Sequence, residues 1–386
     1  MKISKIAKIA AVAIAFGLIA TTPAQAGQSI SGSGASFPYP LIDACKGPFA
    51  AQSTAGDSYT YPAGGSSAIG QGNSDKSLGD FWMSDGAYTA PTKRASLIHI
   101  PLVAAPIAVL YNFPTTKKTL QLSAATIAGI FGGTITRWND PAIVADNNKP
   151  TVVTIYKKDR YGNPVKVDGK LVVLRTQTVK GNLTLPDQKI SVIYRIDSSG
   201  TTENFTNYLN KSAGSVWTKA KSKVFKDSFP GDINSADNLG RVVGASSSTN
   251  TTSLAGRTPY SITYAEVNYA AANKLKIANV INPAGNTVVP DATGVGAFLA
   301  SATQDANGFL TYDYASKEPG AYPLGIVSYM LADTAYPDKA KAASVKAIAT
   351  FILSPACSKT VGAALGFSVI DGALLKKSLD QVAKIG

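Results

Sequence analysis

Strand-like apolar runs alternate with helical stretches along this chain, and the alternation constrains the fold more than any other feature. Leu97–Asn112 and Ile190–Tyr194 have the apolar character of buried strands, the first interrupted by two prolines. Ser123–Phe131 has the start signal of a capped helix, and Lys339–Ile352 has the apolar spacing of an amphipathic helix. We therefore predict α/β architecture. The chain has 386 residues, enough for two lobes of ordinary size.

Residues 1–26 have the pattern of a secretory signal peptide. Three lysines precede the apolar run Ile9–Ala20, and the segment ends in Ala-Gln-Ala, a small-residue cleavage pattern. No cysteine follows the expected cut after Ala26, so we predict no lipid anchor. No later apolar run reaches the roughly 18 residues of a membrane span. We expect a periplasmic or secreted protein without membrane insertion.

The chain is basic, with a formal net charge of +13, which becomes +10 without the three lysines of the signal segment. A basic surface raises the local concentration of anions and speeds their capture. Charged residues make up only 16% of the chain, and no long Lys/Arg cluster is interleaved with aromatic residues. We therefore expect an anionic small molecule as partner and no nucleic acid.

The stretch RIDSSGTTENFTNYL (Arg195–Leu209) places a guanidinium, a carboxylate and two hydroxyls in front of an amphipathic helix. The helix should start near Ser199 to Thr202, with Glu203 in its first turn as a capping-box partner. Free backbone N–H groups and the positive end of the helix dipole attract anions there. Arg195 adds a planar, two-pronged donor. The alternative is an ordinary helix cap beside a surface arginine.

Three other loops resemble this one in kind, although each alone is a common glycine-serine turn. GSGASFP (Gly32–Pro38) offers hydroxyls and backbone N–H groups ahead of a helix. AGGSSAIG (Ala63–Gly70) repeats the pattern, and MSDGAYT (Met83–Thr89) supplies a second carboxylate, Asp85. Together the four loops provide several helix-start donors, one arginine and two aspartates.

A carboxylate beside these donors suits an anion that itself carries a proton. Phosphate near neutral pH keeps at least one P–OH, which can donate to a carboxylate, whereas sulfate has none. An unmatched buried polar group costs roughly 1–3 kcal/mol, enough for substantial discrimination. We therefore interpret Asp197 as a residue that selects phosphate by accepting its proton. The alternative is that Asp197 only orients Arg195.

Catalytic and metal sites are not indicated. The single histidine, His99, lies inside an apolar strand-like run and should be buried. One histidine and two distant cysteines do not suit a zinc cluster. Neither the nucleophile-elbow motif nor the P-loop motif occurs. We expect a binding protein without a cofactor or metal, and not an enzyme.

The segment 151–190 differs in character from its surroundings. RYGNPVKVDGKLVVLRTQT alternates apolar and polar residues around Gly162-Asn163-Pro164 and Asp168-Gly169, which is typical of hairpin turns. The segment carries eight basic and three acidic residues, a net charge of +5. We expect a solvated, projecting basic hairpin rather than a binding arm.

These motifs resemble the PstS-type phosphate-binding proteins of bacterial ABC transporters. GSGASFP resembles that family's G-A-G-A-T-F-P, GGSSAIG its second glycine-serine loop, and Ser84-Asp85 its A-S-D-A-P. Arg195–Leu209 is similar to R-x-D-x-S-G-T-x-x-x-F-x-x-Y-L over its full length. Leu122–Ile143 resembles the family's helix and K-W-N-D-P-A-I segment, and ITYAEVNYA its G-Y-V-E-Y-A-Y-A. The matches are ordered along the chain and span about two-thirds of it.

The resemblance implies a two-lobed periplasmic-binding-protein fold with a hinge and a central anion-binding cleft. The first lobe would comprise residues 27–104 and 276–386, and the second residues 105–275, with the basic hairpin around 151–190 as an addition. Matched motif by motif, the implied phosphate-binding residues are Ser36, Phe37, Ser66, Asp85, Arg195, Asp197, Ser199, Gly200 and Thr201. Asp85 would accept the phosphate proton, and Arg195 would bind bidentately while held by a carboxylate.

The two cysteines, Cys45 and Cys357, lie near opposite ends of the mature chain. From the residues alone they are either a disulfide, as an oxidising compartment allows, or two buried thiols. The resemblance places both in the first lobe, on helices from opposite chain ends, and so implies a disulfide between them.

The implied function is binding of inorganic phosphate outside the cytoplasm and delivery to an ABC permease. The alternative is an exported phosphate-binding relative that acts as a surface or matrix scavenger or adhesin. The low charge content and the additional hairpin favour that alternative.

Overall fold

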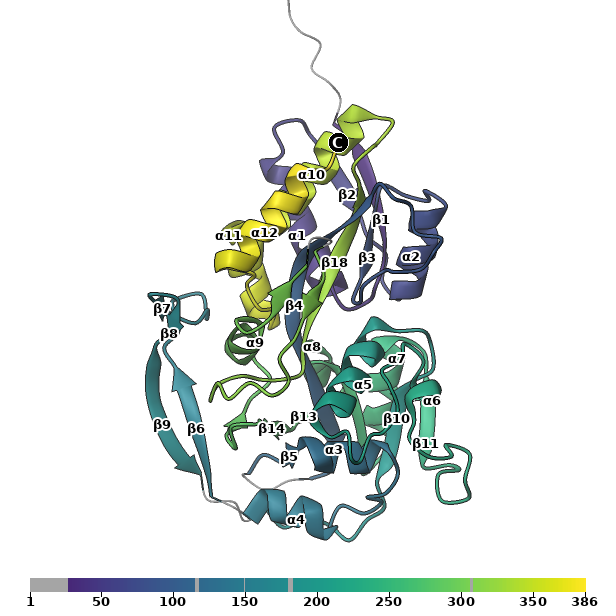
Figure 1. Ribbon diagram of the computed structural model, residues 1–386, viewed down its shortest axis with the longest axis vertical. Helices are drawn as coiled ribbons and strands as arrows, with labels where there is room; N and C mark the ends of the chain where they lie inside the picture. The colour runs from purple at the N-terminus through teal and green to yellow at the C-terminus, as the bar shows by residue number, and fades with distance from the viewer. Residues whose placement is uncertain (1–26, 115–117, 149, 180–182, 306–307) are drawn as a thin grey trace, which may run out of the picture.

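The computed structural model describes residues 27–114, 118–148, 150–179, 183–305 and 308–386. The predicted signal peptide lies outside the described residues. Two lobes are stacked along the long axis of the molecule, and a nine-stranded sheet runs through both (Figure 1). Helices pack beside the sheet in each lobe, which confirms the predicted two-lobed α/β fold.

The large sheet has the strand order β11-β10-β12-β4-β18-β3-β1-β2, with β13 also paired to β4. Its strands are β1 (Ser29–Gly34), β2 (Ser58–Thr60), β3 (Phe81–Ser84), β4 (Leu97–Asn112), β10 (Ser191–Arg195), β11 (Val242–Ala245), β12 (Ser261–Glu266), β13 (Lys276–Ile277) and β18 (Gly325–Asp333).

Strand β4 connects the two lobes. Its first part, Leu97–Pro106, pairs with β18, and its second part, Ile107–Asn112, pairs with β12. The prolines do not interrupt it, so the expected break is wrong. The pairing with β18 instead shifts register by one residue between Pro101 and Val103, and Pro106 lies where the partner strand changes. Proline, which lacks an N–H, is tolerated at such bulges and junctions.

Helices lie between the strands along the chain, and several of them pack against the large sheet. The helices are α1 (Tyr39–Gln52), α2 (Ser67–Asp75), α3 (Ala124–Phe131), α4 (Pro141–Asn148), α5 (Gly200–Ser212), α6 (Phe225–Ser228), α7 (Ser247–Arg257), α8 (Asn268–Ala272), α9 (Ala292–Leu299), α10 (Lys339–Leu353), α11 (Pro355–Cys357) and α12 (Gly372–Ala383). A π-turn (Ser358–Gly362) and a 3₁₀ turn (Ala363–Leu365) follow α11.

Four of these helices start close to the carboxyl ends of parallel strands. Strand β1 leads into α1, β10 into α5 and β11 into α7, while α2 begins beside the ends of β1 and β3. β1 is parallel to β3, and β10 is parallel to β11. In open α/β sheets, ligands bind beyond the carboxyl ends of the strands, where helix N-termini present free N–H groups.

A small sheet lies beyond the large one, with β14 (Asn279–Ile281) between β5 (Gln121–Ser123) and β15 (Thr287–Val288). β13 pairs with the second part of β4, and β14 pairs with β5. The predicted lobe limits stay a prediction.

The predicted hairpin is present. β6 (Thr151–Tyr156) pairs with β9 (Val173–Val179), and β7 (Lys166–Val167) pairs with β8 (Lys170–Leu171) across the two-residue turn Asp168-Gly169. Both turn residues have positive φ, 51° and 76°, as a type I′ hairpin turn requires. Figure 1 shows the hairpin standing apart from the second lobe and extending along the molecule.

The tip of the hairpin is not merely solvated. Lys166 Nζ lies 2.8 Å from Asp371 Oδ1 at the start of α12, so the hairpin contacts the first lobe. Closer to its base, Tyr156 donates a hydrogen bond to Glu318 at 2.9 Å, and Lys158 lies 3.3 Å from Asp291. The expectation of a purely projecting hairpin is therefore corrected. Its outer strand β9 remains exposed.

A disulfide joins Cys45 in α1 to Cys357 in α11, with a Cα–Cα distance of 5.7 Å. This confirms the pairing that the family resemblance implied. Both residues are fully buried.

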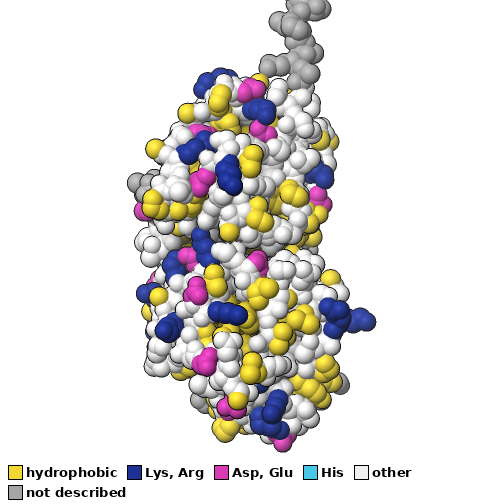
Figure 2. All heavy atoms as spheres, turned by 90° about the vertical axis from the view of Figure 1, so that its right-hand side faces the viewer, with side chains coloured by type: hydrophobic (Ala, Val, Ile, Leu, Met, Phe, Trp, Pro, Cys, Tyr) yellow, Lys and Arg dark blue, Asp and Glu magenta, His cyan; other side chains and the backbone are white. Residues whose placement is uncertain are grey.

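Among the described residues, no single helix has the length and apolar character needed to cross a bilayer. The pair Lys339–Leu353 and Pro355–Leu365, bent by 51°, meets that test only when its two parts are combined. On the face shown in Figure 2, Lys and Arg side chains are scattered among Asp and Glu and form no continuous band.

Candidate functional site

The predicted binding residues, called the cage below, lie at the carboxyl ends of the parallel strands. Ser36 and Phe37 occupy the loop between β1 and α1, and Asp85 directly follows β3. In the other lobe, Arg195 ends β10, and Ser199 precedes the first turn of α5. Nearly all cage residues are buried; the side chain of Asp197, 25% exposed, is the exception.

Helix α5 begins as the sequence predicts. Ser199 is the N-cap, and its Oγ accepts a hydrogen bond from the N–H of Thr202 at 3.2 Å. The other half of the predicted capping box is absent. The Ser199 N–H donates to the carbonyl of Lys223, and the Glu203 carboxylate pairs with Lys221. A tertiary contact has replaced the local one, because the loop before α5 packs against residues 221–223.

Arg195 is almost completely buried and is held from two sides. Its Nε donates to Asp197 Oδ1 at 2.8 Å, and its Nη2 donates to Asp197 Oδ2. Its Nη1 donates to Ser248 Oγ at 3.1 Å. This planar, two-pronged pairing fixes the guanidinium. One N–H group on each terminal nitrogen has no partner among the described residues.

Asp197 has both oxygens occupied. Besides the two bonds from Arg195, Oδ1 accepts the backbone N–H of Ser247 at 3.0 Å. Burial acts to raise the pKa of Asp197, but the hydrogen bond and charge of Arg195 hold it below its usual range. A carboxylate so stabilised as an anion, with three of its roughly four lone pairs engaged, fits the role of orienting Arg195. The interpretation of Asp197 as the proton acceptor is not supported by this geometry.

The environment of Asp85 differs from that of Asp197 in burial and in hydrogen bonding. It is 4% exposed, and its Oδ1 has no hydrogen-bond partner in the described part of the chain. Its pKa is raised to about 7, mainly because burial disfavours the carboxylate and also because Glu266 is near. The charge of Arg195 and the hydroxyls of Ser328 and Ser67 act in the opposite direction. Asp85 is therefore the cage carboxyl that is free to accept a proton from a ligand.

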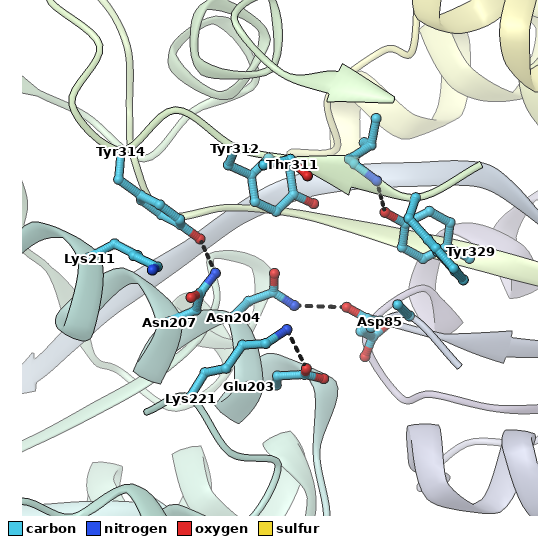
Figure 3. Close-up of a pocket in the computed structure, with 14 residues that line it drawn as sticks. Asp85, Glu203, Asn204, Asn207, Lys211, Lys221, Thr311, Tyr312, Tyr314 and Tyr329 are labelled. Carbon is cyan, nitrogen blue, oxygen red and sulfur yellow. Dashed lines mark hydrogen bonds and ion pairs between the residues drawn. The ribbon is translucent and has the colours of Figure 1, made fainter. Parts of the chain in front are cut away.

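The two lobes touch at Asp85. A Cβ on Gly200 would lie 2.5 Å from the Asp85 Cβ and 2.7 Å from Ser67 Oγ, so only glycine fits at the start of α5. The Asn204 amide donates to the Asp85 carbonyl at 2.8 Å (Figure 3). Lys223 donates to Gln71 at 3.0 Å, also between the lobes. The structure therefore has the lobes in contact around the cage.

Comparisons with known proteins agree with this geometry. Residues 20–356 match the model of the PBP superfamily domain. The phosphate-binding protein PstS 3 of Mycobacterium tuberculosis is 32% identical over 310 residues, 77% of this chain and 71% of that protein. The phosphate-binding protein PstS of Xylella fastidiosa is 28% identical over 326 residues, 81% of this chain and 74% of that protein.

A solved structure with a similar fold is the phosphate-binding protein from Stenotrophomonas maltophilia. It has a TM-score of 0.60 and 17% identity, and the match covers 92% of this chain and 93% of that one. The chain belongs to the PstS-type family of phosphate-binding proteins.

Three residues that contact the cage were not among the predicted binding residues, although one of them, Ser67, belongs to the AGGSSAIG loop. Ser67 Oγ accepts the backbone N–H of Asp85 at 3.1 Å, whereas the predicted Ser66 caps α2 by accepting the N–H of Ile69. Ser248, which holds Arg195, lies in the serine-rich stretch after β11. Ser248 lies in the first turn of α7, and a serine at the start of a helix was the feature of the sequence that could have identified it.

Glu266 is the third missed residue and the most informative. It ends β12 and is 1% exposed. Its Oε1 accepts a hydrogen bond from the Thr201 hydroxyl at 3.0 Å, and its Oε2 has no partner among the described residues. The sequence offered two signals: a carboxylate at the end of an apolar strand, and the position of Glu266 in the motif match ITYAEVNYA.

A pocket of about 260 Å³ lies between the lobes next to the cage (Figure 3). Residues of α5 and Lys221 line one side, and the rest of the lining includes Gly86, Ala87, residues 309–312, Tyr314 and Tyr329. Of the cage residues, only Asp85 lines it. The pocket therefore borders the cage and does not coincide with it.

The environment of the single histidine, His99, indicates a structural role. His99 is buried, and its Nε2 accepts the N–H of Tyr88 at 3.1 Å while its ring packs edge-on against Phe309. Burial lowers its pKa to about 3, with a contribution from Lys93. Within the described residues, no group of three or more His, Cys, Asp and Glu is arranged to hold a metal ion.

Proposed function

We propose that this protein binds inorganic phosphate outside the cytoplasm and delivers it to an ABC permease. The observation that carries the proposal is Asp85, a buried carboxyl with a free oxygen beside a fixed arginine. Arg195 and the N-termini of α1, α2, α5 and α7 supply donors to an oxyanion. Asp85 supplies the acceptor that a protonated oxyanion needs.

This set of groups favours phosphate over sulfate. A P–OH can donate to Asp85 Oδ1, whereas a sulfate oxygen would face the carboxylate lone pair against lone pair. The mismatch costs roughly 1–3 kcal/mol, and more when the group is charged. The selecting residue is therefore Asp85, and Asp197 keeps Arg195 in place.

Family membership supports the transport role and disfavours the scavenger or adhesin alternative. The relatives are named phosphate-binding proteins, and one similar solved structure, from Clostridium perfringens, is described as a phosphate ABC transporter substrate-binding protein with bound phosphate. By analogy, the ligand would be released when the lobes separate at a permease. We extend the family's extracytoplasmic location to this chain, in agreement with the predicted signal peptide. The proposed role involves binding and release, with no chemical conversion.

Isothermal calorimetry on purified protein stripped of phosphate by partial unfolding and dialysis tests the proposal. We expect one phosphate per chain and weaker binding of sulfate. The affinity for arsenate relative to phosphate measures how closely the cage fits its ligand. The variant Asp85→Asn should lose most of the preference for phosphate over sulfate. Absence of heat with phosphate, together with a native circular dichroism spectrum, would refute the proposal.

A further inference from the structure

The side chains around the cage carry more negative than positive charge. Arg195 is the buried cation, and Asp197 already neutralises it. Asp85 and Glu266 are two further buried carboxyl groups. The remaining nearby cation, Lys223, interacts electrostatically with Asp85 and is bound to Gln71. An anion is therefore held by oriented N–H groups and by Arg195, against the carboxylate charge. Near pH 6, below the raised pKa of Asp85 of about 7, Asp85 is mostly uncharged, and Glu266 is then the carboxyl group that opposes an anion.

Glu266 lies beside the cage and not in a distant part of the protein. It contacts Thr201, one of the predicted ligand-binding residues, and interacts electrostatically with both Asp85 and Arg195. Tyr269, on α8, is the other titratable group that faces it. Its Oε2 is buried without a hydrogen-bond partner in the described structure. No cation neutralises Glu266 through an ion pair among the described residues.

A buried, unneutralised carboxylate repels an incoming anion in proportion to the charge of that anion. The repulsion of a dianion is therefore twice that of a monoanion at the same place. Dihydrogen phosphate carries one charge and sulfate carries two. A charge beside the cage thus discriminates between them even without touching either ligand.

We propose that Glu266 is a specificity residue of the cage, whose buried charge favours a singly charged, protonated oxyanion over a doubly charged one. The inference rests on the proposed function and adds a second basis for the selection of phosphate over sulfate. Asp85 recognises the proton of the ligand, whereas Glu266 acts on the ligand's total charge. Glu266 also holds the Thr201 hydroxyl, and glutamine at this position keeps an acceptor for that bond.

The test is the variant Glu266→Gln, studied by calorimetry with phosphate and sulfate near pH 6, where phosphate is mostly a monoanion. Removal of the charge should improve sulfate binding more than phosphate binding. We expect the phosphate-to-sulfate affinity ratio to fall by on the order of fivefold to tenfold, from a unit charge several ångströms away. Near pH 9, where phosphate is a dianion, the variant should change the two affinities by similar factors.

The matched control is Glu203→Gln. Glu203 also lies between the lobes, but it belongs to the neighbouring pocket and not to the cage, and its partner Lys221, at 2.8 Å, is 51% exposed. Solvent therefore screens the charge that Glu203→Gln leaves unpaired, and the affinity ratio should stay closer to the wild-type value than in Glu266→Gln. A residue that only supports the fold would weaken both anions equally, and an unchanged ratio in Glu266→Gln would overturn the inference. Wild-type protein that fails to bind phosphate would instead overturn the proposed function.

Discussion

Replacement of Arg195 by alanine tests the central interaction of the proposed site. Of the five N–H donors of an arginine, the structure engages three, two with Asp197 and one with Ser248. The remaining two are available to the anion. Since a hydrogen bond to a charged group contributes about 1.5–3 kcal/mol, Arg195→Ala should weaken phosphate binding by at least about 2 kcal/mol, or roughly 30-fold in Kd.

The same substitution should lower the free energy of unfolding, because Asp197 keeps only the N–H of Ser247. Loss of one partner of a buried ion pair typically costs about 3–5 kcal/mol, and the partial exposure of Asp197 reduces the expected loss to about 2–3 kcal/mol. The folded-state pKa of Asp197 is lowered, so its contribution to stability is present above its unfolded pKa and is lost as pH falls through the folded value. The difference between wild type and variant should therefore shrink in acid.

Calorimetry measures the affinity, and urea denaturation at neutral and acidic pH measures the stability. Arg195→Lys keeps the charge but not the planar fork, so it should recover only part of the affinity. The matched control is Arg241→Ala. Arg241 is also buried, but it binds Asn238 away from the cage, so its loss should lower stability and leave Kd unchanged. A phosphate titration of Arg195→Ala that equals wild type would remove Arg195 from the site.

Three further variants test the two carboxyl groups of the cage and the disulfide. Asp197→Asn should weaken phosphate and sulfate by similar factors, because Asp197 orients Arg195; a gain for sulfate relative to phosphate would restore the proton-acceptor role. Asp85→Asn should lose phosphate selectivity by about tenfold or more, as expected for one mismatched buried group, and titrations of both anions that match wild type would contradict this. Cys45→Ala with Cys357→Ala should lower the free energy of unfolding by about 3–5 kcal/mol, because the disulfide closes a loop with a sequence separation of 312. Equal stability of oxidised wild type and this double variant in urea would show that the loop closure contributes nothing.

Local features of the fold could be predicted from short stretches of sequence. The Ser199 cap of α5, the Ser123 cap of α3 and the Asp168-Gly169 turn each depend on a few consecutive residues. Their hydrogen bonds and dihedral angles are determined within one turn of chain. The predicted capping-box role of Glu203 was wrong for the complementary reason, because Lys221 provides a stronger partner through a tertiary contact.

The sequence by itself determined the α/β class, the loops that form the cage, and the presence of an arginine with two aspartates near them. The tertiary structure decided what each carboxylate does. Asp197 and Asp85 have the same side chain, yet both oxygens of Asp197 are bound by Arg195, whereas Asp85 keeps a free oxygen in a buried position. Glu266 joins the cage only because β12 and the start of α5 lie side by side. The role of a carboxylate follows from its burial and its partners, and these depend on contacts between residues far apart in the chain.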